Sequence, residues 1–170
     1  MFDGIRVPRS YPKVRAVASA LAVVGLACVA LAPGSASAKV GDRNGTIKLG
    51  YAKGYCLANK TDTPQVSVAG CNGKRNQAWL VSAVGSRNGT IKLGYAQSYC
   101  LQGDKGTGKV HTAACNGKQN QAWLVSASGT PNGTIKLGYA QGYCLTNDKG
   151  TSKARLGSCD GTQSQAWLVS

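Results

Sequence analysis

The sequence predicts an all-β protein made of three copies of one unit. The segment NGTIKLGYA occupies residues 44–52 and returns letter for letter at residues 88–96 and 132–140, so the period is 44 residues. A second segment, QAWLVS, recurs with the same period at residues 77–82, 121–126 and 165–170. Self-similarity at a fixed period of this length indicates a repeated structural unit. The copies are residues 41–84, 85–128 and 129–170.

Short apolar and β-branched runs predict the strands within one copy. In the first copy these runs are Thr46–Leu49, Tyr55–Ala58, Val66–Ala69 and Ala78–Val81. Gly, Asn, Asp and Pro residues separate them, as is typical of short strands joined by turns. Asn88-Gly89 and Asn132-Gly133 each lie between the last run of one copy and the first run of the next, where positive φ angles at both residues would fit a tight hairpin. We therefore expect hairpins to join consecutive copies.

Three units of four short strands can close into a threefold barrel, the β-trefoil, or into a very small propeller. Propellers normally have four or more blades, so three copies favour the β-trefoil. In Thr46–Leu49 the alternation places Ile47 and Leu49 inward and Lys48 outward. The chain contains one Phe and one Met, so its three large apolar rings, Trp79, Trp123 and Trp167, are expected in the core.

Residues 1–38 have the composition of a signal peptide. Four basic residues up to Arg15 precede an apolar run over residues 16–32, and Ala36-Ser37-Ala38 offers the small residues of a cleavage site. The run is shorter than the roughly 20 residues that a spanning helix needs. We expect cleavage after Ala38, a secreted domain of residues 39–170 and no membrane span after cleavage. An uncleaved anchor and a lipid anchor on Cys28 are the alternatives.

Removing this leader leaves 132 of the 170 residues, with 16 basic and five acidic side chains and a net charge of +11. Two Cys remain in each copy, always 15 residues apart. An even number of Cys in an exported chain predicts disulfides. Six Cys allow 15 pairings, and the threefold repetition favours Cys56 with Cys71, Cys100 with Cys115, and Cys144 with Cys159. We expect no metal site and no cofactor, because Cys-x-x-Cys is absent and His111 is the only His.

The order of these motifs resembles the ricin-type β-trefoil lectin family and its Gln-x-Trp repeat. In each copy a Cys-Leu pair is followed by the second Cys and then by Gln-Ala-Trp, and the similarity covers residues 41–170. The resemblance implies the β-trefoil topology, a disulfide within each copy and sugar binding. It also implies that the three Trp residues belong to the core, with sugar stacking on them as the alternative.

A sugar site of that family usually combines an Asp two residues after the first Cys, an aromatic residue two before the second Cys, and a polar pair before the Trp. The first position holds Ala58, Gln102 and Thr146 here, and the second holds Ala69, Ala113 and Gly157. The polar pair remains as Asn76-Gln77 and Asn120-Gln121, and in part as Gln165. Such amides can donate to and accept from sugar hydroxyls. Bracing of the fold by the three Gln residues is the alternative.

Tyrosines and lysines supply further candidates for ligand contact. The stretch between Ile47 and Cys56 is longer than the family spacing and contains two Tyr residues. Tyr55 shares strand parity with Leu57, so we expect it to cap the core. The candidates for exposed sugar contact are Tyr51, Tyr95 and Tyr139. The outward-facing lysines Lys48, Lys92 and Lys136 would contribute to a positive surface that attracts polyanions.

Together these features predict a secreted, monomeric, carbohydrate-binding, lectin-like module. One alternative is a basic adhesion module that binds anionic polysaccharide or a cell-wall polymer. Another is a trefoil-type inhibitor that acts on a protein through the segments 59–65, 103–109 and 147–153. We expect no catalysis, because Glu is absent and the threefold arrangement holds Asp104 and Asp148 apart. We expect no nucleic-acid partner, because the basic residues are spread evenly and the chain is exported.

Overall fold

The computed structural model describes residues 45–82, 84–126, 129–148 and 151–170. All of them belong to one compact unit, residues 37–170. The predicted leader, residues 1–38, lies outside the described residues. Within the described ranges, no helix is long and apolar enough to cross a membrane.

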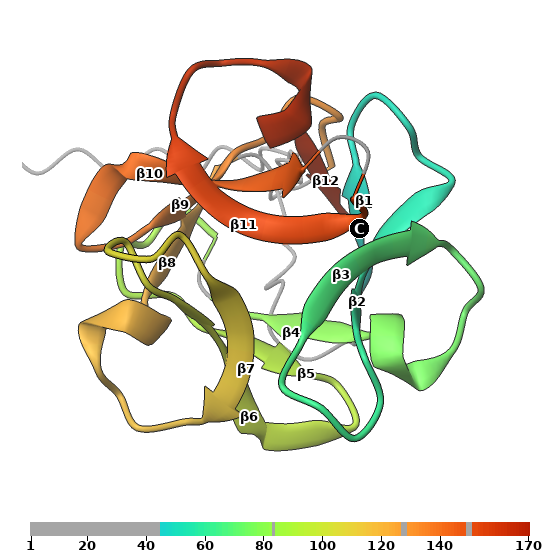
Figure 1. Ribbon diagram of the computed structural model, residues 1–170, viewed down its shortest axis with the longest axis horizontal. Coiled ribbons are helices and arrows are strands. Elements are labelled where there is room, and N and C mark those ends of the chain that lie inside the picture. Colours follow the sequence, from blue (N-terminus) through green and yellow to red (C-terminus); the bar gives the residue numbers. More distant parts are fainter. Residues whose placement is uncertain (1–44, 83, 127–128, 149–150) are drawn as a thin grey trace, which may run out of the picture. The chain divides into compact units, whose positions relative to one another are not determined.

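Each copy forms four short strands and one 3-10 turn (Figure 1). The first copy contains β1 (Ile47–Leu49), β2 (Tyr55–Asn59), β3 (Val66–Gly70), η1 (Arg75–Gln77) and β4 (Trp79–Val81). The second contains β5 (Ile91–Leu93), β6 (Ala96–Gly103), β7 (Val110–Ala114), η2 (Gln119–Gln121) and β8 (Trp123–Val125). The third contains β9 (Ile135–Leu137), β10 (Ala140–Asp148), β11 (Lys153–Ser158), η3 (Gln163–Gln165) and β12 (Trp167–Val169). The runs predicted for the first copy agree with these strands to within one residue.

Six of the strands close into a barrel. Antiparallel pairs join β4 to β5, β8 to β9 and β12 to β1, so the last strand of each copy pairs with the first strand of another. Bridges between Gly45 and Trp79, Gly89 and Trp123, and Gly133 and Trp167 connect these three pairs in a ring. The first copy therefore pairs with the third, and closure leaves the barrel without an unpaired edge. This arrangement confirms the β-trefoil.

The connection between copies is a hairpin, as predicted, but its turn is not the Asn-Gly pair. Positive φ occurs at Gly85 and Gly129, and Asn88-Gly89 and Asn132-Gly133 have none. Gly89 belongs to the barrel pairing instead, since its carbonyl accepts a hydrogen bond from Trp123 N at 2.7 Å. At the equivalent Gly45, a Cβ atom would collide with the backbone oxygen of Ser170. At Gly45 the glycine is therefore required by the close approach of two backbones.

Three longer hairpins, β2–β3, β6–β7 and β10–β11, cover one end of the barrel and surround its centre in Figure 1. Their second strands contact one another in a ring. Gln65 pairs with His111, Lys109 with Arg155, and Lys153 with Ser67. We call the ring formed by the adjoining ends of β3, β7 and β11 the hairpin cap.

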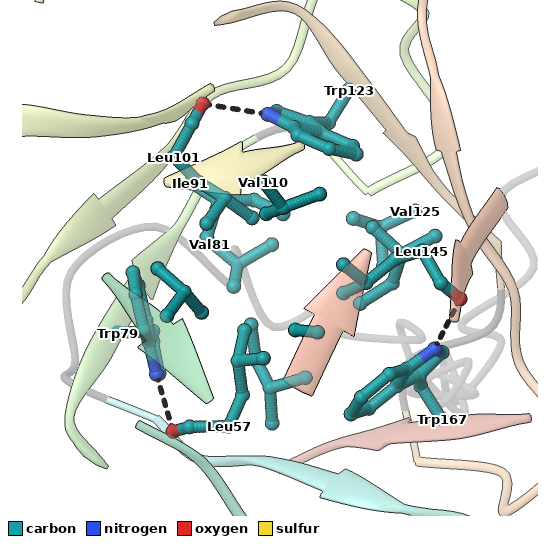
Figure 2. Close-up of a cluster of buried hydrophobic side chains, with 14 of the residues drawn as sticks. Leu57, Trp79, Val81, Ile91, Leu101, Val110, Trp123, Val125, Leu145 and Trp167 are labelled. Carbon is teal, nitrogen blue, oxygen red and sulfur yellow. Dashed lines mark hydrogen bonds between the residues drawn. The ribbon is translucent and has the colours of Figure 1, made fainter. Parts of the chain in front are cut away.

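The core lies between the barrel and the hairpin cap, and Trp79, Trp123 and Trp167 are its largest side chains, each at most 1% exposed. Each indole Nε1 donates a hydrogen bond of 2.8 Å to a backbone carbonyl on the hairpin of its own copy (Figure 2). The acceptors are Leu57, Leu101 and Leu145. This satisfies the polar group of a buried Trp and confirms the core position predicted for the three rings.

The three disulfides have the predicted pairing, Cys56–Cys71, Cys100–Cys115 and Cys144–Cys159. In each bridge the first Cys is buried on a hairpin strand next to a core Leu, and the second follows the hairpin's other strand. Closing a loop of 15 residues stabilises the folded chain by about 3 kcal/mol in the chain-entropy model. Each bridge thus fixes the outer end of one hairpin.

The junction between the second and third copies is packed differently from the other two. Asn59 and Asn147 occupy equivalent positions in the first and third copies, whereas the second copy has Gly103. A Cβ atom on Gly103 would lie 2.8 Å from Leu156 Cδ1 and 3.0 Å from the Trp123 ring. Leu156 is larger than its counterparts Val68 and Thr112, and it takes up the room that a side chain at position 103 would need.

The Gly103→Ala substitution is expected to lower the free energy of unfolding by about 1–3 kcal/mol, because it overpacks a buried contact. Gly70→Ala is the matched control, since nothing lies within 4 Å of a Cβ atom at that strand position. Urea denaturation of both variants measures the difference. Equal free energies of unfolding would contradict the prediction, because they would show that the side chains around Leu156 rearrange to accommodate the added methyl group without cost.

Candidate functional site

Of the three positions that usually form a family sugar site, the Asp and aromatic positions lie on the hairpin strands, and the polar pair lies on the 3-10 turn. The side chains at the two hairpin positions offer little to a sugar here. Ala58 and Thr146 are buried, and the Thr146 hydroxyl donates to the Cys144 carbonyl at 3.1 Å. Cys56 pairs with Ala69 and Cys100 with Ala113, so the strand position of the usual aromatic residue carries only a methyl group. No ring is available there for stacking on a pyranose.

Gln77, Gln121 and Gln165 brace the chain segment after each disulfide. Each is at most 2% exposed. Their Oε1 atoms accept hydrogen bonds of 2.8–2.9 Å from the backbone N–H groups of Asn72, Asn116 and Asp160. Their Nε2 atoms donate to the carbonyls of Gly70, Ala114 and Ser158 at 2.6–2.9 Å. Both ends of every amide are occupied within the chain, which favours the bracing interpretation.

Asn76 and Asn120 precede these glutamines and are half-buried. Asn76 Nδ2 donates to the Asn59 carbonyl at 3.0 Å and ties the 3-10 turn to β2. In the second copy the strand position equivalent to Asn59 is Gly103. The Oδ1 atom of Asn120 is buried and has no hydrogen-bond partner among the described residues. The two side chains are therefore not equivalent despite their matching sequence positions.

The turn after each second Cys is closed by a side-chain oxygen that accepts from the backbone two residues on. Asn72, Asn116 and Asp160 fill this role with bonds of 2.9 Å. The backbone N–H and the hydroxyl of Thr162 lower the pKa of Asp160 below its usual value. Hydrogen bonds from the Thr107 hydroxyl and the Gly106 N–H likewise lower the pKa of Asp104 in the β6–β7 turn. Both carboxylates shape local turns.

The lowered pKa of Asp160 predicts an acid sensitivity that Asp160→Asn should reduce. A carboxyl group whose pKa is lower in the folded chain than in the unfolded chain stabilises the fold above the unfolded value, and this contribution disappears as pH falls through the folded value. Asn keeps the acceptor oxygen, as in the first two copies. We expect near-equal stability at about pH 6 and a smaller loss in the variant at about pH 3. Chemical denaturation at both pH values measures this; parallel losses would contradict it.

Exposed tyrosines form the main aromatic surface of the described residues. Tyr51, Tyr95 and Tyr139 are 43%, 39% and 39% exposed, in agreement with their prediction as exposed side chains. Tyr55 was expected to cap the core, and this is wrong, because it is 52% exposed. It has the strand parity of Leu57, but it lies at the outer end of β2 opposite Gly70, beyond the core.

Tyr95 and Tyr99 line a cleft of about 360 Å³ together with Asn59 and Asp62 of the preceding copy. We call this set the first tyrosine cleft. Asn59 is buried. In the amide orientation that gives every polar atom a partner, Nδ2 donates to the Thr63 and Gln65 carbonyls, and Oδ1 accepts from the Tyr95 hydroxyl at 3.2 Å. The hydroxyl oxygen of Tyr95 is thereby held at the cleft and keeps acceptor capacity.

Tyr95 is positioned from a second side as well. The guanidinium of Arg75 lies 5.2 Å from the centre of its ring, within the range of a cation–π contact. Arg75 belongs to the first copy, as do Asn59 and Asp62. Residues of one copy therefore orient a tyrosine of the next.

The second tyrosine cleft is related to the first by the threefold repeat and measures about 220 Å³. Tyr51, Tyr55, Asn147 and Asp148 line it. Asn147 Nδ2 donates to the Tyr51 hydroxyl at 3.2 Å. This cleft thus contains the same chemistry as the first, two aromatic rings with an amide and a carboxylate from a neighbouring copy.

The third junction lacks this combination. Gly103 replaces the Asn, and Gly106 stands where the first copy has Asp62, although Asp104 occupies the position equivalent to Asp148. The ammonium group of Lys105 lies 5.6 Å from the centre of the Tyr139 ring. Tyr143 is partly buried and packs against the core. Of the three predicted tyrosines, Tyr51 and Tyr95 therefore each have an Asn side chain at the hydroxyl, and Tyr139 has none because Gly103 stands at that position.

Lys48, Lys92 and Lys136 lie on the barrel strands β1, β5 and β9 and are half-buried, between inward-facing residues. Each pairs across the strands with a Leu of the copy that precedes it around the ring. The partners are Leu168, Leu80 and Leu124, respectively. None forms an ion pair with a described residue. None of the three lines a tyrosine cleft.

Sequence reasoning missed the residues that complete the clefts, Asn59, Asp62, Tyr99, Asn147 and Asp148. Apart from Tyr99, they lie in the segments where the copies differ, and these segments were predicted only as contact loops. Two features together could have identified them: the sequence differences between the copies at these segments, and the closure of the three copies into a ring. In a closed ring the tip of each hairpin contacts the next copy. The usual family pattern names positions within a single copy and therefore does not include contacts between copies.

The family model for the ricin-type β-trefoil lectin domain matches residues 43–167. No curated protein sequence gives a significant match. Among solved structures, a mosquitocidal holotoxin shares 18% identity at a TM-score of 0.64, and the alignment covers 74% of this chain and 17% of the toxin. The chain thus spans a small part of that protein.

Two smaller structures are similar over a larger share of their length. The β-trefoil lectin of the Vibrio vulnificus hemolysin/cytolysin, solved with N-acetyl-D-lactosamine bound, shares 16% identity at a TM-score of 0.60, covering 75% of this chain and 93% of that one. A non-toxic homologue of type II RIPs from Momordica charantia (bitter gourd), in complex with α-methyl-D-galactoside, shares 24% identity at a TM-score of 0.58, covering 74% and 46%. At these identities the likeness establishes the fold.

Proposed function

The chain belongs to the ricin-type β-trefoil lectin domain family, and on this premise we propose that it is a secreted, non-catalytic module that binds neutral carbohydrate at its two tyrosine clefts. The observation that carries the proposal is the composition of these clefts. Each joins two exposed tyrosines of one copy to an amide and a carboxylate of the preceding copy around the ring. The family position in each copy, by contrast, lacks both Asp and aromatic residue.

Carbohydrate recognition needs an apolar surface for the ring face and fixed polar groups for the hydroxyls. Exposed tyrosine rings supply the first, and Asp62 or Asp148 supplies acceptors for hydroxyl donors. The Tyr95 hydroxyl is held by Asn59 and its ring by Arg75, so little side-chain entropy remains to be lost on binding. Similar reasoning applies to Tyr51 and Asn147.

Solved structures of similar fold that contain a bound sugar support the proposal of carbohydrate binding. Two similar structures were solved with N-acetyl-D-lactosamine and α-methyl-D-galactoside bound. Export of the protein is supported by the leader-like composition of residues 1–38 and by three disulfides, which persist in oxidising compartments.

Neutral-glycan binding is expected at two sites per chain. A glycan array identifies the neutral ligand, and calorimetry with that ligand counts the sites. The Tyr51→Ala/Tyr95→Ala variant should lose about tenfold or more in affinity, because the stacking surface and the held hydroxyl are removed from both clefts. Tyr139→Ala removes an equally exposed ring from the third junction and should keep full affinity.

Salt distinguishes this site from a purely electrostatic one. Binding of a neutral glycan should survive roughly 0.5 M salt, which screens exposed charges. Loss of affinity in the Tyr139→Ala variant alone would contradict the assignment to the two clefts. Absence of binding to every neutral and acidic glycan would instead favour the alternative of a trefoil-type inhibitor.

A further inference from the structure

A large cavity lies at the hairpin cap, away from the tyrosine side chains of the proposed sugar site. It measures about 800 Å³ and is lined by residues from all three hairpins, including Gln65, Lys109 and Lys153. We call it the cap cavity. Its size is that of typical small-molecule sites, which range from about 300 to 1,000 Å³.

Strand alternation decides which side chains face this cavity. Val66, Val110 and Ala154 are buried at 6–7% exposure and point toward the core. The residues on either side of them must then point outward. The outward positions before them hold Gln65, Lys109 and Lys153, and those after them hold Ser67, His111 and Arg155. The cross-strand pairs Gln65–His111, Lys109–Arg155 and Lys153–Ser67 bring these six residues together in one ring.

The ring carries a strong positive charge. Lys109, Lys153 and Arg155 belong to it, and Lys60 lines the same cavity from the β2–β3 turn. The opposing charge is Asp148, whose carboxylate lies 3.8 Å from Arg155 Nε. Both partners of this pair are exposed, so the pair is screened and leaves most of the positive field in place.

The floor of the cavity is apolar. Val66, Val110, Ala154 and Leu156 line it beneath the charged ring. Ordinary solvated lysines project from a convex surface, whereas these surround a concave floor where a ligand would exclude water from their charges. A cationic rim above an apolar floor is suited to a ligand that has both an anionic group and an apolar face.

We infer that the cap cavity binds an anionic sugar unit of a polysaccharide, with its sulfate or carboxylate group at Lys109, Lys153 and Arg155 and its ring over the apolar floor. Sulfated and uronic-acid sugars share this chemistry. The cap cavity contains no tyrosine, and the two residues it shares with the tyrosine clefts, Pro64 and Asp148, are not among the proposed anion-binding side chains. Failure of either site would leave the other in place.

The test compares two variants of equal charge. Lys60→Ala/Lys109→Ala/Lys153→Ala removes three lysines from the cap cavity and leaves the Arg155–Asp148 pair intact. Lys53→Ala/Lys74→Ala/Lys118→Ala removes three exposed lysines that do not line it. Affinities for dextran sulfate, for a polyuronate and for uncharged dextran of the same length are measured at low and high salt.

The cap variant is expected to lose about tenfold or more in affinity for the anionic polymers, while the control changes by less than about threefold, because only the cap lysines converge on one ligand. The polyuronate and dextran sulfate arms show which anionic group is preferred. Thermal unfolding of both variants monitors the fold. In the unmodified protein, NMR chemical-shift changes should appear at Val66 and Val110, on the floor of the cavity.

Equal losses in the two variants would overturn the site, because they would show that net charge alone attracts the polymer. Unchanged affinity in the cap variant would do the same. Equal binding of a single-stranded oligonucleotide through the cap lysines would overturn the assignment to carbohydrate. The Tyr51→Ala/Tyr95→Ala variant should retain its affinity for the anionic polymers, which separates this site from the neutral-sugar clefts.

Discussion

The hydrogen bond from each buried Trp to a hairpin carbonyl is the interaction on which the rest of the structure depends. It connects the Trp of a barrel strand to a Leu carbonyl 22 residues earlier, on the hairpin of the same copy. The ring itself fills the core between the two layers (Figure 2). Burying a Trp without a partner for its N–H would carry a desolvation cost. Because the same contact occurs three times, each hairpin is attached to the barrel in the same way.

This common scaffold explains why function must lie at the junctions. The inner surface of every copy is occupied by Ile, Leu, Val and Trp, and the buried glutamines are occupied by backbone groups. Variation is possible where the tip of one hairpin meets the next copy. There Asn59 and Asn147 hold tyrosines, whereas Gly103 accommodates Leu156. One difference in core volume thus changes the chemistry of a surface cleft.

Charge is distributed by the same geometry. Lysines on the barrel strands are held apart, while those at the outward positions of β3, β7 and β11 converge, because the three strands pair around the centre. An even spread of basic residues along the sequence therefore becomes a local concentration in space. The sequence-based expectation of a diffuse positive surface is accurate for Lys48 and its counterparts and incomplete for Lys109, Lys153 and Arg155.

By itself the sequence determined the repeat, the strand positions, the buried Trp residues and the disulfide pairing, because periodicity and local alternation act within one copy. It misplaced Tyr55 and the positive φ angles of the connecting turns, since both depend on where the core ends and where backbones meet. Only the tertiary structure decided that Tyr95 faces Asn59 and that Lys109 lies beside Arg155. These partners come from different copies, and closure of the barrel brings them together.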